Sequence, residues 1–92
     1  MTVTVDAPDL HIVTEGLRFP EGPVCMPDGS LALVELEARR ITRVTQNGTK
    51  STIATVTGAP NGLAMGPNGL LYLCNNGGFS WHEEPGLLRP DF

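Results

Sequence analysis

The 92-residue sequence has few aromatic and few basic residues and no long apolar segment. Aromatic side chains make up only 5% of it, which is little for the core of a self-sufficient domain. There are 6 basic and 10 acidic residues, for a net charge of −4, and no basic cluster is longer than Arg39-Arg40. Because phosphate binding needs a positive surface, nucleic acid is not an expected partner. No apolar run approaches the length of a membrane span, so no membrane partner is expected either.

Cysteine is also scarce. We expect the two cysteines, Cys25 and Cys74, to be small buried apolar residues in a reducing compartment rather than a disulfide. Residues 1–6 have no basic flank and no hydrophobic region, so the sequence predicts no signal peptide. These features predict a cytoplasmic protein and leave its oligomeric state open.

Glycine and proline are abundant, with 11 and 8 residues, and they mark a repeat. Segment 19–35 aligns with segment 59–75 at a shift of 40 positions, and 6 of the 17 positions are identical. Chance would give roughly one identity in seventeen. A period near forty, built from short strands and glycine turns, is typical of β-propeller blades; the alternative is two unrelated hairpins in a small β domain. The identical pairs are Pro20/Pro60, Gly22/Gly62, Pro27/Pro67, Gly29/Gly69, Leu31/Leu71 and Leu33/Leu73.

Each copy contains two short apolar runs separated by a turn sequence, Pro-Asp-Gly at 27–29 and Pro-Asn-Gly at 67–69. Proline sets the backbone angle at the start of such a turn and glycine takes the position with positive φ, so each copy is predicted to be a hairpin. Further strands are expected at 40–45 and 49–56, on either side of an Asn-Gly turn at 47–48. The first copy would then belong to a four-stranded antiparallel blade.

The sequence divides into five segments in this interpretation. Residues 1–8 are a lead-in, and 9–18 contain a short strand, at 11–14, that would complete the last blade of an intact ring. Residues 19–57 form the first blade and 58–78 the first half of the second. Because Pro85 and Pro90 oppose a regular strand, 79–92 are expected to be a loop or insertion that interrupts the blade. Propellers have about four to eight blades, so the chain is interpreted as an all-β, N-terminal fragment of a longer protein.

Two residues at the predicted starts of inner strands are candidates for a site. Glu21 lies between Pro20 and Gly22, and inner strands of a propeller converge on a central channel. Its carboxylate could bind a hard cation, position a substrate or simply be solvated. Asn61 has the same place in the second copy, where its side chain could ligate a metal, donate to a substrate hydroxyl or belong to an Asn-Gly turn.

A second cluster, Trp-His-Glu-Glu at 81–84, lacks the spacing of a zinc protease helix and is expected to be a solvated loop. In an alternative reading, Phe79 and Trp81 cap the channel mouth as part of a substrate lid. Neither cysteine has a neighbouring base that would make it a nucleophile, and no catalytic residue is assigned.

The segments 15–23, 27–29, 59–64 and 75–78 together resemble the start of the senescence-marker-protein / gluconolactonase / luciferin-regenerating-enzyme family. The resemblance covers about residues 10–92, and its most specific element is Phe-Pro-Glu-Gly-Pro at 19–23. It implies a six-bladed β-propeller, of which this chain would be the first one and a half blades. It also implies hydrolysis of sugar lactones and related esters with one divalent metal ion, which could be calcium, zinc, magnesium or manganese.

The resemblance assigns Glu21 as a metal ligand, and Asn61 maps onto the channel lining, where it would bind substrate. The other ligands, an Asn and an Asp, would come from later blades. The expected function is therefore that of a fragment of a gluconolactonase-like hydrolase acting on a small sugar lactone, inactive alone for want of those ligands. The alternatives are a non-catalytic propeller module that binds a partner or acts as a scaffold, and a small β domain that stands alone or assembles.

Overall fold

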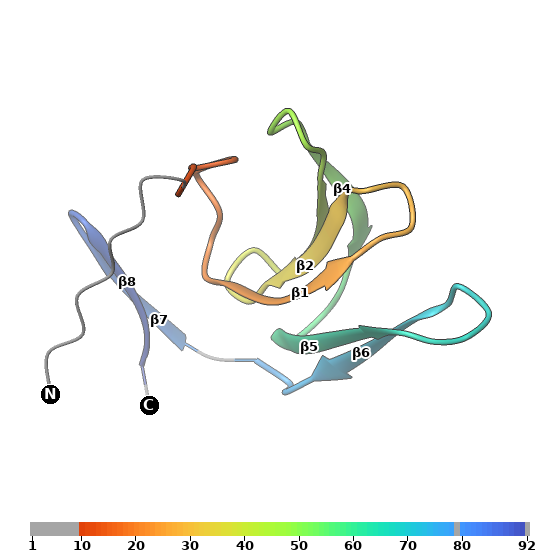
Figure 1. Ribbon diagram of the computed structural model, residues 1–92. Helices are drawn as coiled ribbons and strands as arrows, with labels where there is room; N and C mark the ends of the chain where they lie inside the picture. The colour runs from red at the N-terminus through yellow and green to blue at the C-terminus, as the bar shows by residue number, and fades with distance from the viewer. Residues whose placement is uncertain (1–9, 79, 92) are drawn as a thin grey trace, which may run out of the picture.

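The computed structural model describes residues 10–78 and 80–91, which form an all-β structure of small antiparallel sheets (Figure 1). A four-stranded sheet has the order β1-β2-β3-β4, and two separate hairpins follow, β5–β6 and β7–β8. No helix long and apolar enough to cross a membrane occurs in these residues. The strands are β1 (Pro20–Cys25), β2 (Leu31–Glu35), β3 (Arg40–Val44), β4 (Lys50–Thr55), β5 (Pro60–Met65), β6 (Leu71–Asn75), β7 (Ser80–Glu84) and β8 (Leu87–Asp91).

The turns of the β1–β2 and β5–β6 hairpins are built alike, as the repeat predicts. Gly29 and Gly69 have φ angles of 86° and 80°, in the left-handed region that glycine enters without strain. The same two backbone hydrogen bonds close both turns, forty positions apart. They run from Met26 N to Ser30 O (2.8 Å) and Gly29 N to Met26 O (3.0 Å), and from Gly66 N to Leu70 O (2.7 Å) and Gly69 N to Gly66 O (3.2 Å).

The open ends of the two hairpins also match. The amide of Leu36 donates to the carbonyl of Phe19 at 3.1 Å, and the amide of Asn76 donates to the carbonyl of Ala59 at 2.9 Å. The first strand of each hairpin contains an irregularity near this end, between Glu21 and Val24 in β1 and between Pro60 and Gly62 in β5. The 40-residue repeat is therefore a repeat of backbone structure as well as of sequence.

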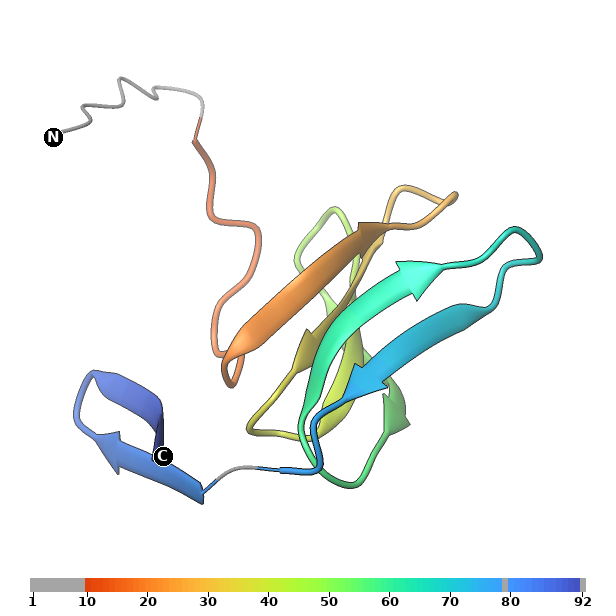
Figure 2. The same ribbon diagram turned by 90° about the horizontal axis from the view of Figure 1, so that it is seen from below.

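The hydrophobic core lies between the four-stranded sheet and the β5–β6 hairpin. Its buried centre is Val34, Leu36 and Ile41. Strands β1 and β5 lie side by side and run in the same direction, as both ribbon views show (Figures 1 and 2). Partly buried side chains from β4, β5, β6, β7 and the residue before β1 pack against this centre: Phe19, Ala54, Leu63, Leu73 and Trp81.

Gly22 lies where the backbone of β1 closely approaches the backbone of β5. A Cβ at this position would stand 3.2 Å from the backbone nitrogen of Leu63 in β5, and the φ angle of Gly22 is 55°. A larger residue would therefore meet both backbone strain and the neighbouring strand. This gives a physical reason for the glycine that follows Glu21.

The strand predicted within 9–18 is wrong in its described part, because residues 10–17 have no regular secondary structure. A strand needs a neighbour with which to exchange backbone hydrogen bonds. The described chain provides no such neighbour for these residues, which are tied down instead by the Lys50 ammonium group donating to the carbonyl of Glu15.

The sequence predicts a loop or an insertion at residues 79–92, and the loop is wrong over most of the described length, because β7 and β8 form a regular hairpin there. Gly86, at a φ of 77°, supplies the tight turn after Pro85. Pro90 lies opposite Trp81. Both strands of a two-stranded hairpin are edge strands, where proline is tolerated because its missing N–H can face away from the partner.

Candidate functional site

Glu21 is the second residue of β1, lies opposite Val34 of β2 and has an exposed side chain. Its carboxylate makes no hydrogen bond or ion pair with any residue in the described part of the chain. The acceptor sites of both carboxylate oxygens are therefore open to water or to a ligand.

Asn61 is the second residue of β5 and is also exposed. Pro60 pairs with Asn75 and Gly62 with Cys74, so Asn61 is the extra residue of a β-bulge and has no residue opposite it. The backbone carbonyl oxygen of Asn61 lies 3.7 Å from the position that a Cβ on Gly22 would occupy. The backbone of Gly22, next to Glu21, therefore lies close to the backbone of Asn61.

A divalent cation at Glu21 would need more ligands than this pair supplies, because calcium, for example, takes about six to eight oxygens. Within residues 10–78 and 80–91, no three His, Cys, Asp or Glu side chains lie close enough together to hold a metal ion. The unpaired carboxylate of Glu21 fits the role of one ligand. Asn61, water or residues outside the described part would have to complete the set.

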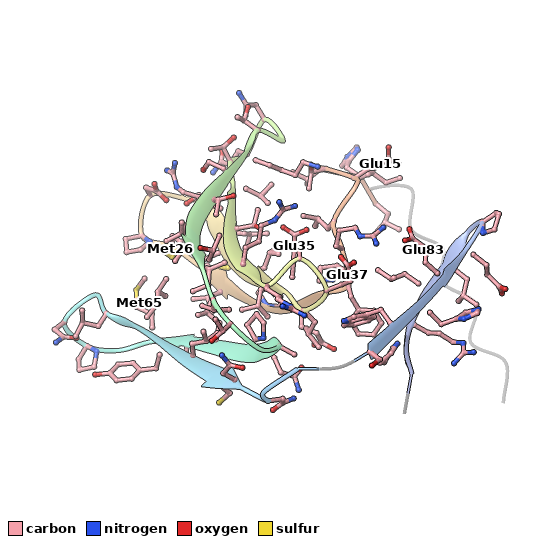
Figure 3. The ribbon with its side chains drawn as sticks, turned by 180° about the vertical axis from the view of Figure 1, so that it is seen from behind. Glu15, Met26, Glu35, Glu37, Met65 and Glu83 are labelled. Carbon is pink, nitrogen blue, oxygen red and sulfur yellow. The ribbon has the colours of Figure 1, made fainter. Side chains whose placement is uncertain are left out.

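A buried polar cluster that no sequence pattern predicted is centred on Glu35. Glu35 ends β2, and it is 0% exposed, in the interior of the molecule (Figure 3). Its Oε2 accepts hydrogen bonds from Arg40 Nε at 2.6 Å and from the Thr42 hydroxyl, and its Oε1 accepts from Arg40 Nη2 at 3.0 Å and from the Arg18 amide at 2.8 Å.

These hydrogen bonds decide the charge state of Glu35. Burial raises the pKa of its carboxyl group, but the hydrogen bonds from Arg40, Thr42 and the Arg18 amide outweigh burial and hold the pKa below its ordinary value. Both oxygens already accept two hydrogen bonds each, which leaves no lone pair for a ligand. The Glu35 cluster is therefore structural, and it fixes the segment that leads into β1.

The place of Glu35 in the repeat could have revealed this role. Forty positions on stands Asn75, which ends β6 as Glu35 ends β2. Asn75 Oδ1 accepts from the amides of Ala59 and Gly77, both at 3.1 Å, much as Glu35 accepts from the Arg18 amide. In each copy, an acceptor side chain at the end of the second strand binds the backbone just before the first strand.

Arg18 joins three parts of the chain. Its backbone amide donates to Glu35, and its guanidinium forms a bidentate ion pair with Glu37, at 2.8 and 3.0 Å. A second bidentate ion pair, at 2.7 and 3.1 Å, joins the same guanidinium to Glu83 of β7. The hydrogen bonds to Glu37 and Glu83 raise the pKa of Arg18 further above its ordinary value, and Arg18 in turn lowers the pKa of both carboxyl groups.

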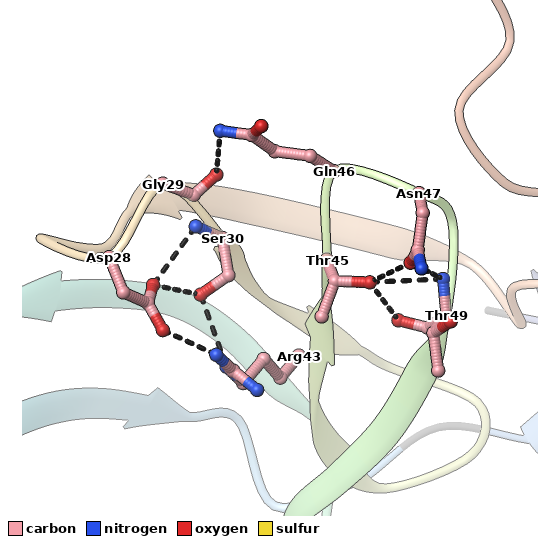
Figure 4. A pocket seen from close by; sticks show the side chains of 8 residues that line it. All are labelled: Asp28, Gly29, Ser30, Arg43, Thr45, Gln46, Asn47 and Thr49. Atoms are coloured by element: carbon pink, nitrogen blue, oxygen red, sulfur yellow. Dashed lines mark hydrogen bonds and ion pairs between the residues drawn. The ribbon is translucent and has the colours of Figure 1, made fainter.

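A polar hollow of about 480 Å³ lies at the opposite end of the four-stranded sheet from Glu21, between the β1–β2 and β3–β4 turns (Figure 4). Asp28 accepts hydrogen bonds from the Ser30 hydroxyl at 2.5 Å and the Ser30 amide at 3.0 Å, and it pairs with Arg43. These bonds, those from Ser30 foremost, hold the pKa of Asp28 well below its ordinary value. The charged groups of the hollow thus satisfy each other.

The two cysteines are free and exposed, so their predicted burial is wrong. Alternate residues of a strand point to opposite faces of a sheet. Val24 and Leu73 take the partly buried positions, and Cys25 and Cys74, one residue later, point outward. Of the two residues predicted to form a lid, Trp81 packs on Phe19, and Phe79 lies outside the described residues.

In comparisons with known proteins, the chain matches no family model and no curated protein. The fold defines the class as an all-β protein of small antiparallel sheets built on a 40-residue repeat. Any function must therefore be argued from the residues and their geometry.

Proposed function

We propose that this chain is part of a metal-dependent hydrolase of sugar lactones with a six-bladed β-propeller fold. In this proposal, β1–β4 are the first blade and β5–β6 are the inner half of the second. Two observations support the propeller: the backbone hydrogen bonds repeat at a spacing of forty, and β1 and β5 lie side by side in the same direction, as inner strands of neighbouring blades would. The resemblance of residues 15–23 to the gluconolactonase family supports the chemistry.

The observation that carries the proposal is the placement of Glu21. It is an exposed carboxylate without a partner in the described chain, at the start of the first inner strand and next to the start of the second. A divalent cation, when bound, would polarise a lactone carbonyl and lower the pKa of a bound water. Glu21 would hold the ion, and the side-chain amide of Asn61 would donate a hydrogen bond to a substrate hydroxyl.

The test compares two glutamate substitutions in the full-length protein that contains residues 1–92. Glu21→Gln keeps the shape of the side chain and removes its charge, so metal affinity and hydrolysis of D-glucono-1,5-lactone should both fall by at least about tenfold. Glu15→Gln is the control, because Glu15 is exposed and its side chain has no partner in the described residues.

Isothermal titration calorimetry with calcium, zinc, magnesium and manganese measures the affinity, and a pH-stat measures lactone hydrolysis. If the unmodified protein binds none of these ions and hydrolyses no lactone, the proposal is wrong and the scaffold alternative gains support. Equal effects of Glu21→Gln and Glu15→Gln would remove Glu21 from the site.

A further inference from the structure

The β5–β6 hairpin packs one face against the core, and we name its other face the outward face. Leu63 and Leu73 lie opposite each other and pack against the buried centre of the core. Neighbouring residues of a strand point to opposite sides of a sheet, so the outward face is made of the residues on either side of these two. They pair across the hairpin as Gly62 with Cys74 and Ala64 with Tyr72.

The 40-residue repeat gives the outward face an equivalent in the four-stranded sheet. Ala32 and Val34 stand forty positions before Tyr72 and Cys74, and both are 0% exposed. The side of the sheet that carries them faces the β5–β6 hairpin, which packs against it. Tyr72, in contrast, is 57% exposed, and Cys74 is exposed as well. The same face of the repeat unit is therefore covered in the first copy and uncovered in the second.

Gly62 is a glycine that the contacts of the described residues do not explain. Its equivalent, Gly22, has a φ of 55°, and a Cβ there would stand 3.2 Å from the backbone of β5. Gly62 has no positive φ, and within the described chain a Cβ there would meet only Cys74, at 3.6 and 3.8 Å, which are ordinary contact distances. Glycine is expected at position 62 if another strand approaches the outward face as β5 approaches β1.

The outward face contains a hollow of about 290 Å³, and no charged side chain lines it. Burial of apolar surface in such a place is favourable, whereas a charged group would lose its hydration there without gaining a charged partner. The chemistry of the hollow therefore fits an apolar occupant. Its lining residues are Gly62, Leu63, Ala64, Tyr72, Leu73 and Cys74.

We propose that the outward face is a docking surface for the first hairpin of a third 40-residue repeat unit, supplied by the polypeptide that contains residues 1–92. The interface between the four-stranded sheet and β5–β6 is repeated there. The first strand of the incoming hairpin runs beside β5 at Gly62, as β5 runs beside β1, and an apolar pair equivalent to Leu63 and Leu73 covers Tyr72 and Cys74. This inference rests on the propeller part of the proposed function and needs neither a metal ion nor a lactone.

The rate at which N-ethylmaleimide modifies Cys74 in the full-length protein, read by peptide mass spectrometry, measures whether the outward face is covered. Two variants provide the comparison. Ala64→Cys adds a thiol on the outward face, and Asn68→Cys adds one at the exposed turn of the same hairpin. The thiols at 64 and 74 should react at least about tenfold more slowly than the thiol at 68, because a covered thiol reacts only when its cover opens. Equal rates at the three positions overturn the proposal.

A photoreactive residue identifies the occupant. With p-benzoylphenylalanine in place of Tyr72, ultraviolet light should join the outward face to a segment of the same chain that lies about forty positions beyond β5–β6. A cross-link between two chains, together with protection of Cys74 that is lost on dilution, shows that a second copy covers the face and overturns the third repeat as its occupant. A cross-link to any other segment of the same chain overturns it too.

Gly62→Ala tests the close approach of the incoming strand. In the full-length protein the added methyl group should raise the modification rate of Cys74 about fivefold or more, because the strand can no longer approach. An unchanged rate overturns the proposal, and far-UV circular dichroism checks that the sheets are intact. Lactone hydrolysis is measured separately. Protection of Cys74 in a protein without this activity overturns the proposed chemistry alone, and a freely reactive Cys74 in an active hydrolase overturns the docking surface alone.

Discussion

The buried carboxylate of Glu35 offers the sharpest test of how this fold is held together. Glu35→Gln keeps the size of the side chain, removes its charge and replaces one acceptor oxygen with an NH₂ donor. Each carboxylate oxygen of Glu35 accepts two hydrogen bonds, from Arg40 and Thr42 on one side and from Arg40 and the Arg18 amide on the other. Whichever way the new amide turns, its NH₂ group therefore faces two donors.

The size of the effect follows from these contacts. Two hydrogen bonds to a charged group are lost, each worth about 1.5–3 kcal/mol. The guanidinium side chain of Arg40 is 36% exposed, so water compensates part of its loss. We expect the free energy of unfolding to fall by about 3 kcal/mol, at the lower end of the range for breaking a buried ion pair.

Urea denaturation at pH 7, followed by far-UV circular dichroism, measures this change. The control is Glu37→Gln, the same substitution two residues away in a side chain that is 25% exposed and paired with Arg18. Its loss should stay below about 1 kcal/mol, as for other ion pairs near solvent. Equal losses for the two variants would refute the argument that burial and four donors set Glu35 apart.

Two further predictions concern pH and the approach of the sheets. The pKa values of Glu35, Glu37 and Glu83 are lower in the folded chain than the ordinary 4.5, so the unfolded chain takes up protons first as the pH falls. The free energy of unfolding should therefore be constant from pH 7 to about 5 and decline below about 4.5. Thermal melts of Glu35→Gln at the same pH values should show a shallower decline. Gly22→Ala should destabilise the fold by about 1–3 kcal/mol in urea, from positive φ and contact with the β5 backbone. Gly69→Ala, at a φ of 80° with no atom within 4 Å, isolates the φ strain, and an equal loss in both variants would contradict the close approach of β1 and β5.

Both repeated hairpins can be predicted from the sequence because their determinants are local. Proline, Asp or Asn, and glycine act within a single turn, at 27–29 and 67–69, and the alternation of apolar residues sets which face of each strand is buried. The same local reasoning places Glu21 and Asn61 at the starts of β1 and β5, where the structure has them. Their joint role in binding a cation stays a prediction, because a ligand set depends on groups far apart in the sequence.

Glu35 shows what local reasoning misses. The sequence predicts that a glutamate at the end of an apolar strand is exposed to solvent. Glu35 is buried instead, because folding brings Arg18, Arg40 and Thr42 around it. The matching positions of Glu35 and Asn75 in the repeat were visible in the sequence; their partners were not.

The sequence by itself determined the all-β class of the fold, its 40-residue period and the turns of the β1–β2 and β5–β6 hairpins, because short local motifs and their spacing specify these features. The tertiary structure decided that residues 10–17 form no strand and that 80–84 and 87–91 do. It also decided that Trp81 and Glu83 dock on Phe19 and Arg18, more than sixty residues before them. A strand, a buried charge and a packed hairpin each need contacts with residues far away in the sequence, and only the folded chain supplies these contacts.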